Sequence, residues 1–308
     1  MLRGLLISLS GSRSLRAVAE RSSIGRRISG RFVAGTQVED ALRATETVNQ
    51  SGLGVSIDNL GENVTNIEEA RASADLYHQL LDQISARGLK ANVSLKLSHM
   101  GLDVDEKVAY DLVAGLVSQA VAMRPRNFVR VDMEGSVYTQ RTLDLVHELH
   151  RKPENQGCVG AVIQAYMRRS ESDVENLLAE GIRVRLCKGA YQEPPELAFQ
   201  QKSEVDASYL RLMKTLMKSG VYHGLATHDE NIIRQAKLFA SDEKIPRDSF
   251  EFQMLYGIRR DLQQSLAREG WRMRVYIPFG VEWYPYLMRR LAERPANALF
   301  IAKNLLRK

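Results

Sequence analysis

Short apolar segments rich in β-branched residues alternate with longer helical patterns along the chain. The strand-like segments cover residues 53–58, 90–97, 127–133, 160–165, 183–188, 224–227, 250–255 and 272–277. The helix candidates that follow them cover residues 65–87, 105–123, 138–151, 171–180, 202–219, 229–240, 259–269 and 283–306. Eight strand–helix units in one undivided chain of 308 residues predict an α/β protein with a (β/α)8 barrel. A doubly wound sheet is the alternative, but no G-x-G-x-x-G pattern follows any of these strands.

The net charge of +6 belongs to the first 35 residues, which hold seven arginines and one glutamate. The remaining residues carry 36 basic and 36 acidic side chains and are neutral. A nucleic-acid-binding surface over the whole protein is not expected, because it needs a basic excess across the fold. We therefore expect a basic helical N-terminal arm over residues 1–50, followed by the barrel over residues 51–308.

The two cysteines, Cys158 and Cys187, form no Cys-x-x-Cys pattern. Neither a disulfide framework nor a metal site is expected, and a reducing, cytoplasmic setting is the simplest inference. No apolar run approaches the ~18 residues of a membrane span. The arm is rich in Arg and Ser and poor in acids, so mitochondrial import is an alternative reading of its composition.

Charged and hydrogen-bonding residues stand at nearly every carboxyl end of the expected strands. In (β/α)8 barrels these ends and the loops after them form the catalytic mouth. A barrel kept only for stability would not need polar groups there, so the pattern favours an enzyme or a ligand-binding protein. The residues concerned are Asp58, Asn59, Lys96, Asp132, Met133, Glu134, Gln164, Arg185, Lys188, Thr227, His228, Asp229, Gln253 and Tyr276.

Lys96 stands in a strand context that would otherwise be buried, so its ammonium group must find an anion or lose its charge. Three roles are open to it: a structural ion pair with Asp132 or a neighbouring acid, a cation for a substrate carboxylate, or a Schiff-base nucleophile. Asp132 faces the same side of its strand as Arg130, and such an acid can also simply cap the next helix.

Residues 183–191 alternate cleanly, which places Arg183, Arg185 and Cys187 on one side of a strand. The small residues of the Lys-Gly-Ala turn at 188–190 allow a backbone to approach a ligand, and exposed N–H groups there suit a phosphate or pyrophosphate. His228 ends the sixth strand, where it is either a hydrogen-bonding group of the structure or a catalytic base.

The final helix places Tyr286, Arg289, Arg290 and Glu293 on one face by their spacing of three, four and seven residues. Two adjacent arginines with a tyrosine one turn earlier form a good clamp for a small carboxylate. The alternative is a solvated charged face.

Taken together, these motifs resemble the proline dehydrogenase family in its monofunctional form. The resemblance covers roughly residues 53–299, and the arm matches more loosely. It rests on Ser-Leu-Lys-Leu-Ser at 94–98, Val-Asp-Met-Glu at 131–134, Ile-Gln-Ala-Tyr at 163–166, Arg-Leu-Cys-Lys-Gly-Ala-Tyr at 185–191, Ala-Thr-His at 226–228, Phe-Gln-Met-Leu-Tyr-Gly at 252–257, Tyr-Ile-Pro-Phe-Gly at 276–280 and Tyr-x-x-Arg-Arg-Leu-x-Glu-Arg at 286–294.

The resemblance implies an FAD-dependent barrel whose last helix lies over the mouth. It implies oxidation of L-proline to Δ1-pyrroline-5-carboxylate by hydride transfer to flavin N5, the first step of proline catabolism to glutamate, with electrons passed to a membrane quinone. Fused relatives carry an aldehyde dehydrogenase domain that this sequence lacks. The product is therefore expected to leave for a separate pyrroline-5-carboxylate dehydrogenase.

The resemblance also assigns roles to individual residues. Lys96, Arg289 and Arg290 would hold the proline carboxylate, while Leu255, Tyr276 and Tyr286 would shape the ring pocket. Asp132 would pair with this cationic group and orient the site, and Arg185 would lie near flavin N5 and stabilise the negative charge that builds there. The other implied FAD contacts are Met133, Gln164, Lys188, Gly189, Ala190, Thr227, His228, Gln253 and Glu293.

Two rival functions stay open. One is a Schiff-base lyase or aldolase on the same barrel, with Lys96 or Lys188 as the nucleophile. The other is a lipid- or nucleic-acid-binding protein that works through the Arg-rich arm. For a dehydrogenase, the arm could dock the enzyme on the inner face of an anionic membrane near its quinone, or its helices could simply pack on the barrel.

Overall fold

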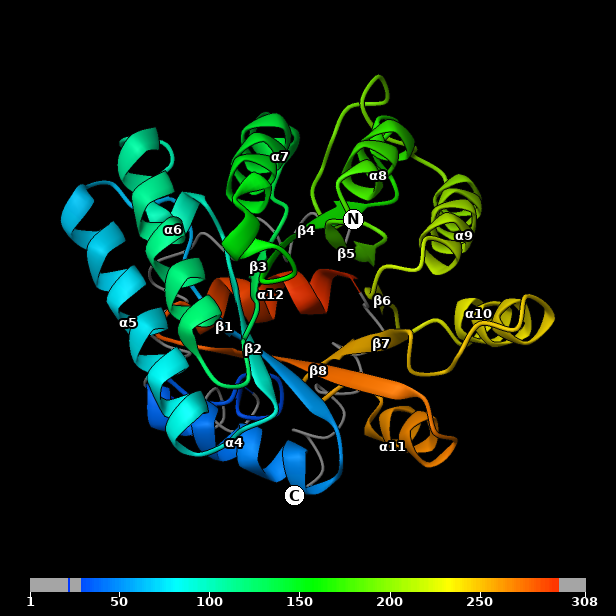
Figure 1. Cartoon of the computed structure of the whole chain (residues 1–308), viewed down its shortest axis with the longest axis horizontal. Coiled ribbons are helices and arrows are strands. Elements are labelled where there is room, and N and C mark those ends of the chain that lie inside the picture. The colour runs from blue at the N-terminus through cyan, green and yellow to red at the C-terminus, as the bar shows by residue number, and fades with distance from the viewer. Residues whose placement is uncertain (1–21, 23–28, 294–308) are drawn as a thin grey trace.

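The computed structural model describes residue 22 and residues 29–293, and these residues form a closed barrel of eight parallel strands in chain order (Figure 1). The (β/α)8 prediction is thereby confirmed. The strands are β1 (Gly54–Asn59), β2 (Ala91–Leu95), β3 (Val129–Val131), β4 (Val159–Gln164), β5 (Arg183–Cys187), β6 (His223–Ala226), β7 (Phe250–Leu255) and β8 (Arg272–Phe279). Strand β1 pairs with both β2 and β8, which closes the sheet.

The helices lie within a few residues of the expected ranges wherever the structure describes them. They are α4 (Val38–Gln50), α5 (Ile67–Ala86), α6 (Glu106–Ala122), α7 (Ser136–Arg151), α8 (Ser170–Ala179), α9 (Lys202–Lys218), α10 (Glu230–Asp242), α11 (Arg260–Arg268) and α12 (Trp283–Glu293). Side-chain caps fix several of their starts. Asp105, for example, accepts a hydrogen bond from the backbone N–H of Val108 at 3.0 Å.

Helix α4, which precedes the first strand, occupies the eighth place in the outer ring. It packs against β8 and β1, and in Figure 1 it lies between α11 and α5. Its buried residues Ala41, Leu42 and Thr45 recur at helical spacing and face the sheet. The last residues of the expected arm over 1–50 are thus helical and cover the barrel wall.

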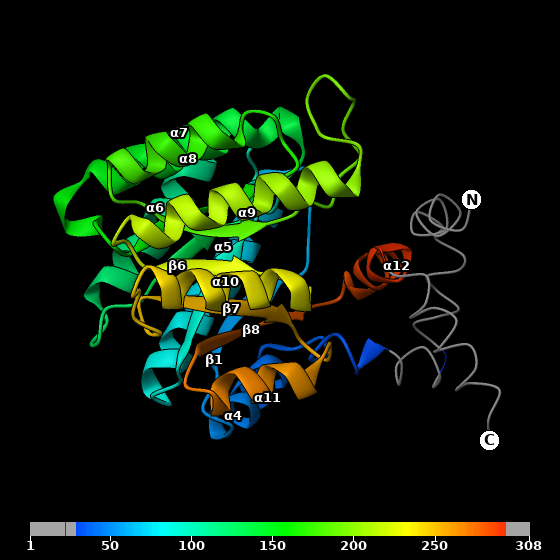
Figure 2. The same cartoon turned by 90° about the vertical axis from the view of Figure 1, so that its right-hand side faces the viewer.

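Helix α12, which follows β8, leaves the ring and lies across the carboxyl end of the barrel, as Figures 1 and 2 show. This is the expected arrangement of a last helix over the mouth. An apolar cluster holds it there, in which Trp283 and Leu287 of α12 pack with Phe32 and Val33 of the segment before α4. The same segment is tied to the strand that leads to α12, since the N–H of Ala34 donates to the carbonyl of Pro278 at 2.9 Å.

The inward-facing side chains of the barrel are unusually polar. The outward positions of β1, such as Val55 and Ile57, face the helices, while Ser56 and Asp58 face the interior and are buried. Most (β/α)8 barrels fill this space with branched apolar residues. The residues that replace them here are Ser56, Ser94, Arg130, Arg185, Glu251, Gln253 and Arg274. Within the described residues, no helix is long and apolar enough to cross a bilayer.

Candidate active site

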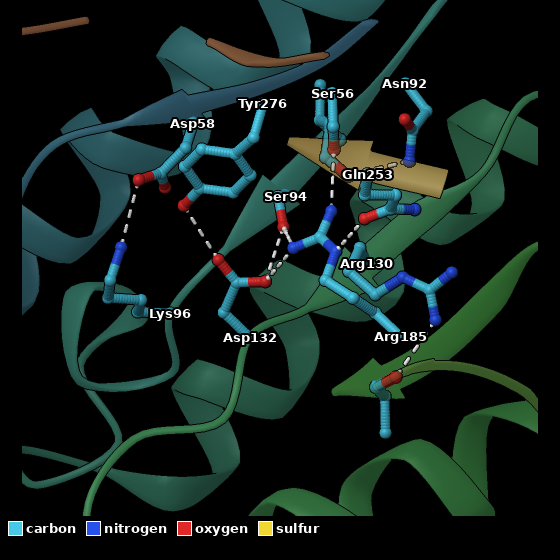
Figure 3. Close-up of polar contacts among 12 residues, drawn as sticks. Ser56, Asp58, Asn92, Ser94, Lys96, Arg130, Asp132, Arg185, Gln253 and Tyr276 are labelled. Atoms are coloured by element: carbon cyan, nitrogen blue, oxygen red, sulfur yellow. Dashed lines mark hydrogen bonds and ion pairs between the residues drawn. The ribbon is translucent and has the colours of Figure 1, made fainter. Parts of the chain in front are cut away.

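An ion pair between Asp132 and Arg185 stands at the centre of the mouth (Figure 3). The Nη1 atom of Arg185 donates to Oδ1 of Asp132 at 2.7 Å, and both residues are buried. Asp132 follows β3 directly, whereas Arg185 points inward from the middle of β5. The hydroxyl of Ser94 on β2 joins the pair, donating to the same carboxylate oxygen at 2.6 Å.

The guanidinium group of Arg185 is held on every side. Besides Asp132, it donates from Nε to Oε1 of Gln253 at 2.5 Å, from Nη2 to the hydroxyl of Ser56 at 3.0 Å and from Nη1 to that of Ser94 at 3.0 Å. These partners come from β7, β1 and β2, so one side chain links strands around the barrel. A planar guanidinium group held by four hydrogen bonds in this way is fixed in position and orientation.

Tyr276 closes the other side of Asp132. Its hydroxyl donates to Oδ2 at 2.9 Å, and the Cζ atom of Arg185 lies 5.1 Å from the centre of its ring. Burial, and then the negative charges of Asp132 and Asp58, raise the pKa of Tyr276 well above its usual value. The phenol therefore keeps its proton and acts as a donor.

Lys96 pairs with Asp58 of β1. Its Nζ lies 3.0 Å from Oδ2 of Asp58 (Figure 3). Asp132, which was expected to pair with the cationic group of Lys96, Arg289 and Arg290, has Arg185 as its direct ion-pair partner, while its charge also acts on Lys96. The sequence predicted that Lys96 would pair with Asp132 or with a neighbouring acid. The structure shows the second case, with Asp58 as that acid.

The charge of Lys96 bears on its chemistry. Burial alone would lower the pKa of Lys96, but Asp58 and Asp132 outweigh it and the pKa is raised above that of a free lysine. A Schiff-base nucleophile must be a neutral amine. The structure thus argues against Lys96 as the nucleophile of a lyase and favours a permanent cation.

The turn after β5 has the tight backbone that its sequence suggested. Gly189 has φ +117°, and a Cβ atom there would meet the ring of Tyr166 at 2.2 Å. The N–H of Ala190 points to Oε1 of Gln164 at 3.4 Å. Lys188 is engaged with two carboxylates, at 2.5 Å from Asp206 and 3.0 Å from Asp229, so its charge is largely balanced by the protein.

The residues that follow β6 accept hydrogen bonds from nearby backbone N–H groups. The hydroxyl of Thr227 accepts the N–H of Asp229 at 3.1 Å, and Nε2 of His228 accepts the N–H of Leu255 at 3.0 Å. Of the two readings for His228, this bond supports the hydrogen-bonding group, since an Nε2 that accepts from the backbone is occupied. The bond also fixes the position of Leu255 at the end of β7.

Helix α12 carries two of the expected substrate residues in a stacked arrangement. Tyr286 is buried, and the Cζ atom of Arg290 lies 5.3 Å from the centre of its ring. The expected roles of Arg289 and Glu293 concern side chains that lie outside the described part of the structure. Met133 is buried two residues after the end of β3, at the same end of the barrel.

Several residues of the site were not singled out from the sequence. Ser56 and Ser94 stand two positions before Asp58 and Lys96, so strand alternation would have placed them on the inward side. Glu251, which accepts from Nε2 of Gln253 at 2.7 Å, lies deeper on β7 and follows the same rule. The roles of Phe32 and Val33 had no local signal, because their partners lie some 250 residues away on α12.

Comparisons with known proteins agree with this geometry. The sequence model of the family Proline dehydrogenase matches residues 41–303. The chain is 39% identical to Proline dehydrogenase 1 of Bacillus subtilis subsp. natto over 100% of both chains. It is 40% identical to Proline dehydrogenase of Deinococcus radiodurans over 91% of this chain and 90% of the relative.

Solved structures show the same fold. The structure of proline utilization A from Bdellovibrio bacteriovorus inactivated by N-propargylglycine superimposes with a TM-score of 0.81 at 26% identity, covering 87% of this chain. The match spans 32% of that longer protein, so the comparison concerns its barrel and not its whole activity. The matching family model, the relatives of equal length and the shared barrel lead to one conclusion: the chain belongs to the proline dehydrogenase family, whose members are FAD-dependent oxidoreductases.

Proposed function

We propose that this protein oxidises L-proline to Δ1-pyrroline-5-carboxylate, with the reaction at the barrel mouth beneath α12. The observation that carries the proposal is the hydrogen-bonded network of Asp132, Arg185 and Tyr276 beside Lys96, at the carboxyl ends of the strands. Oxidation by hydride loss needs a substrate fixed in distance and angle more than it needs an acid or base. Polar side chains and cations that are fixed by hydrogen bonds at the base of the mouth would hold a substrate in this way.

The residues around the mouth fit a flavin cofactor. Gly189 is half-buried and the small Ala190 is exposed, so the backbone of this turn is accessible where a large cofactor must approach closely. We assign FAD binding to Met133, Gln164, Arg185, Lys188, Gly189, Ala190, Thr227, His228, Gln253 and Glu293. When bound, FAD supplies the acceptor for the hydride of the substrate.

The substrate carboxylate would be held by Lys96, Arg289 and Arg290. Lys96 keeps its positive charge because two carboxylates lie near it, and it is only partly buried, so it can serve a further anion. Tyr276, Tyr286 and Leu255 would enclose the ring. A cationic pocket also disfavours a protonated amine, and hydride loss requires the neutral one.

Arg185 would provide a fixed positive charge where negative charge develops. Its four partners hold it without any rearrangement during the reaction, which is the condition for effective electrostatic stabilisation. Asp132 orients this arginine and Tyr276 together. In this account both Asp132 and Arg185 are catalytic residues.

The deciding experiment is an absorption spectrum of the purified protein before and after anaerobic addition of L-proline. A flavin spectrum that bleaches with proline supports the proposal. A colourless protein, or a flavin that proline leaves oxidised, contradicts it. A lyase using Lys96 or Lys188 would instead be trapped covalently on its lysine when borohydride and a carbonyl substrate are added.

For the electron acceptor we propose a membrane quinone, reached by docking of the basic arm on an anionic membrane surface. The support is the concentration of seven arginines in residues 1–35, since such a segment binds anionic lipid surfaces. Salt-sensitive binding to phosphatidylglycerol vesicles, lost on removal of residues 1–28, is expected. Equal binding by both forms would contradict docking by the arm.

The product would pass to a pyrroline-5-carboxylate dehydrogenase on another chain. The support is that relatives named proline dehydrogenase match this chain from end to end. Addition of such an enzyme with its cofactor to the purified protein should convert proline to glutamate, and the purified protein alone should not.

A further inference from the structure

A cavity of about 1320 Å³ opens at the amino-terminal end of the barrel, at the opposite end from α12. The starts of the strands and the loops that lead into them form its walls. Eight of the lining residues are arginine or lysine, and two are acidic, Asp248 and Glu251. This concentration of positive charge stands in a barrel region whose overall composition is neutral.

Arg130 reaches into this cavity from β3 and is 3% exposed. Its Nη1 atom donates to the carbonyls of Ala161 at 2.9 Å and Arg183 at 2.7 Å. Its Nε has no hydrogen-bond partner, and no carboxylate of the described residues lies within 4.0 Å of its guanidinium group. Burial, and then the charges of Arg185 and Arg183, lower the pKa of Arg130 below its usual value.

Arg183 stands beside Arg130 at the start of β5. Its Cζ atom lies 4.2 Å from the ring centre of Phe128, and that of Arg130 lies 4.5 Å from the same centre. Its Nε donates weakly to the carbonyl of Tyr222 at 3.4 Å, and its two terminal nitrogens form no hydrogen bond within the described residues. Two guanidinium groups thus share one aromatic ring without a carboxylate between them.

Glu251, one of the two acidic residues that line the cavity, already forms hydrogen bonds with other side chains. Glu251 accepts from Nε of Arg274 at 2.6 Å, from the hydroxyl of Tyr222 at 2.9 Å and from Nε2 of Gln253. Burial by itself would raise the pKa of Glu251, but Arg274 and these donors lower it, so it is ionised and balances Arg274. The charge of Glu251 also acts on Arg130 and Arg183, but neither guanidinium group forms a direct ion pair with a carboxylate of the described residues.

Buried cations without a partner are costly, and guanidinium groups pair best with oxyanions that accept two parallel hydrogen bonds. We propose that this cavity binds a phosphate group through Arg130 and Arg183, with Arg126 at its rim. Arg126 lines the same cavity. The site lies at the far end of the barrel from Lys96 and Tyr276, and the proposal is independent of the proposed oxidation of proline.

A phosphate group can come from inorganic phosphate or from a small phosphorylated metabolite, and the cavity has room for either. The test is isothermal titration calorimetry of the full chain with inorganic phosphate and with adenosine monophosphate, in a chloride buffer of constant ionic strength. Saturable binding of one of the two is expected. Binding of phosphate alone identifies the free ion, and binding of the nucleotide alone or more tightly identifies an organic phosphate.

The variant Arg183→Gln should weaken binding at least tenfold, and Arg183→Lys should weaken it less, because a lysine keeps the charge but not the paired donors. The matched control is Arg211→Gln, which removes an exposed arginine of α9 on the outside of the barrel. It should bind as the unaltered chain does. Thermal melting without ligand verifies that each variant is folded.

Two outcomes overturn the proposal. One is the absence of saturable binding of either probe to the unaltered chain. The other is equal binding to Arg183→Gln and to Arg211→Gln, since phosphate would then bind elsewhere on the surface. Should Arg183→Gln fail to fold, Arg126→Gln at the rim gives the same comparison with a smaller expected loss.

Discussion

Arg185 is the residue on which the geometry of the mouth converges. It is buried, paired with Asp132 and bonded to side chains from three further strands. A charged group fixed in this manner acts on developing charge at once, without reorganising first. Its contribution should therefore appear in the rate of the chemical step more than in the affinity for substrate.

The change Arg185→Ala tests this directly. We expect the rate of flavin reduction by proline to fall by ~10²-fold or more, while the dissociation constant of proline changes little. Anaerobic stopped-flow absorbance measures both, and the flavin content of the variant, from its spectrum, is the control. Reduction at the normal rate would remove Arg185 from its assigned role.

Lys96 has two possible roles, which mutation can separate. It can stabilise the fold by pairing with Asp58, or it can bind the substrate carboxylate. The change Lys96→Met leaves Asp58 buried without a cation and should cost ~3–5 kcal/mol of stability. The double change Asp58→Asn with Lys96→Met removes both charges and should recover much of that loss. Proline binding should stay weak in both variants if Lys96 holds the carboxylate, so urea unfolding and titration of the flavin spectrum together separate the two roles. Proline affinity that recovers with stability would show a purely structural lysine.

At the scale of elements, α12 depends on a segment from the other end of the chain. Phe32 and Val33 form the apolar surface on which Trp283 and Leu287 rest. The expected substrate residues Tyr286 and Arg290 lie on this helix, so their positions follow from that packing. The helix itself is a single element of eleven residues and would be marginal alone.

The change Phe32→Ala should therefore raise KM for proline several-fold with a small effect on the melting of the barrel. The matched control is Leu266→Ala on α11, a fully buried residue that does not touch α12. That change should lower Tm by several degrees and leave KM unaltered, because it creates a cavity under the wall. Steady-state kinetics with a soluble dye acceptor measure KM, and a normal value in Phe32→Ala would show that α12 needs no such support.

His223 illustrates a different dependence between elements. At the start of β6 its Nδ1 accepts the N–H of Val184 at 3.0 Å, and its Nε2 lies 2.9 Å from the hydroxyl of Ser219 after α9. Burial, and then the charges of Arg130 and Arg183, lower the pKa of His223 to about 3. The neutral ring is the folded form, so the unfolded chain takes up the proton first as the pH falls.

The stability that His223 contributes is thus complete above pH ~6.5 and is lost as the pH falls toward 3, by at most ~1.4 kcal/mol for each pH unit. The variant His223→Asn should be less stable at pH 7 but should lose less free energy of unfolding between pH 6.5 and 4. Urea unfolding at a series of pH values measures both chains. Parallel curves for the two would show that His223 does not carry this pH dependence.

At the scale of the whole molecule, the chain uses its N-terminal region in two ways. Residues 1–28 hold six of the seven arginines of residues 1–35, while α4 forms part of the barrel wall. Removal of residues 1–28 should leave a folded, yellow enzyme that oxidises proline with a soluble dye. Removal of residues 1–50 also uncovers the apolar outer face of β8 and β1 and should give an insoluble or unfolded chain. Expression yield, circular dichroism and dye-linked activity compare the two, and a stable, active product of the longer deletion would contradict the structural role of α4.

The sequence predicted the number and order of the strands because each strand carries its own local pattern, and it predicted the polar mouth because the fold places all strand ends together. Which side chains pair with one another within that mouth was harder to predict. Whether Lys96 pairs with Asp58 or Asp132 depends on how side chains from different strands are arranged in space, which no local pattern records. The place of α4 in the ring and of Phe32 under α12 depends on contacts between residues far apart in the chain. Strand ends also differed slightly, since Lys96 and Asp132 lie one residue beyond β2 and β3.

The position of α4 has a consequence for the order in which the protein folds during synthesis. This helix leaves the ribosome before any of the strands, yet it packs against β8, the last strand to emerge. During the synthesis of the more than two hundred residues between α4 and β8, the apolar face of α4 therefore has β1 and α5 as partners but lacks β8. The barrel is closed at a seam between its earliest and latest segments, and such non-local pairing is the slow step of folding. Nascent chains that stop before residue 272 should accordingly bind chaperones at α4, and completion of β8 should release them.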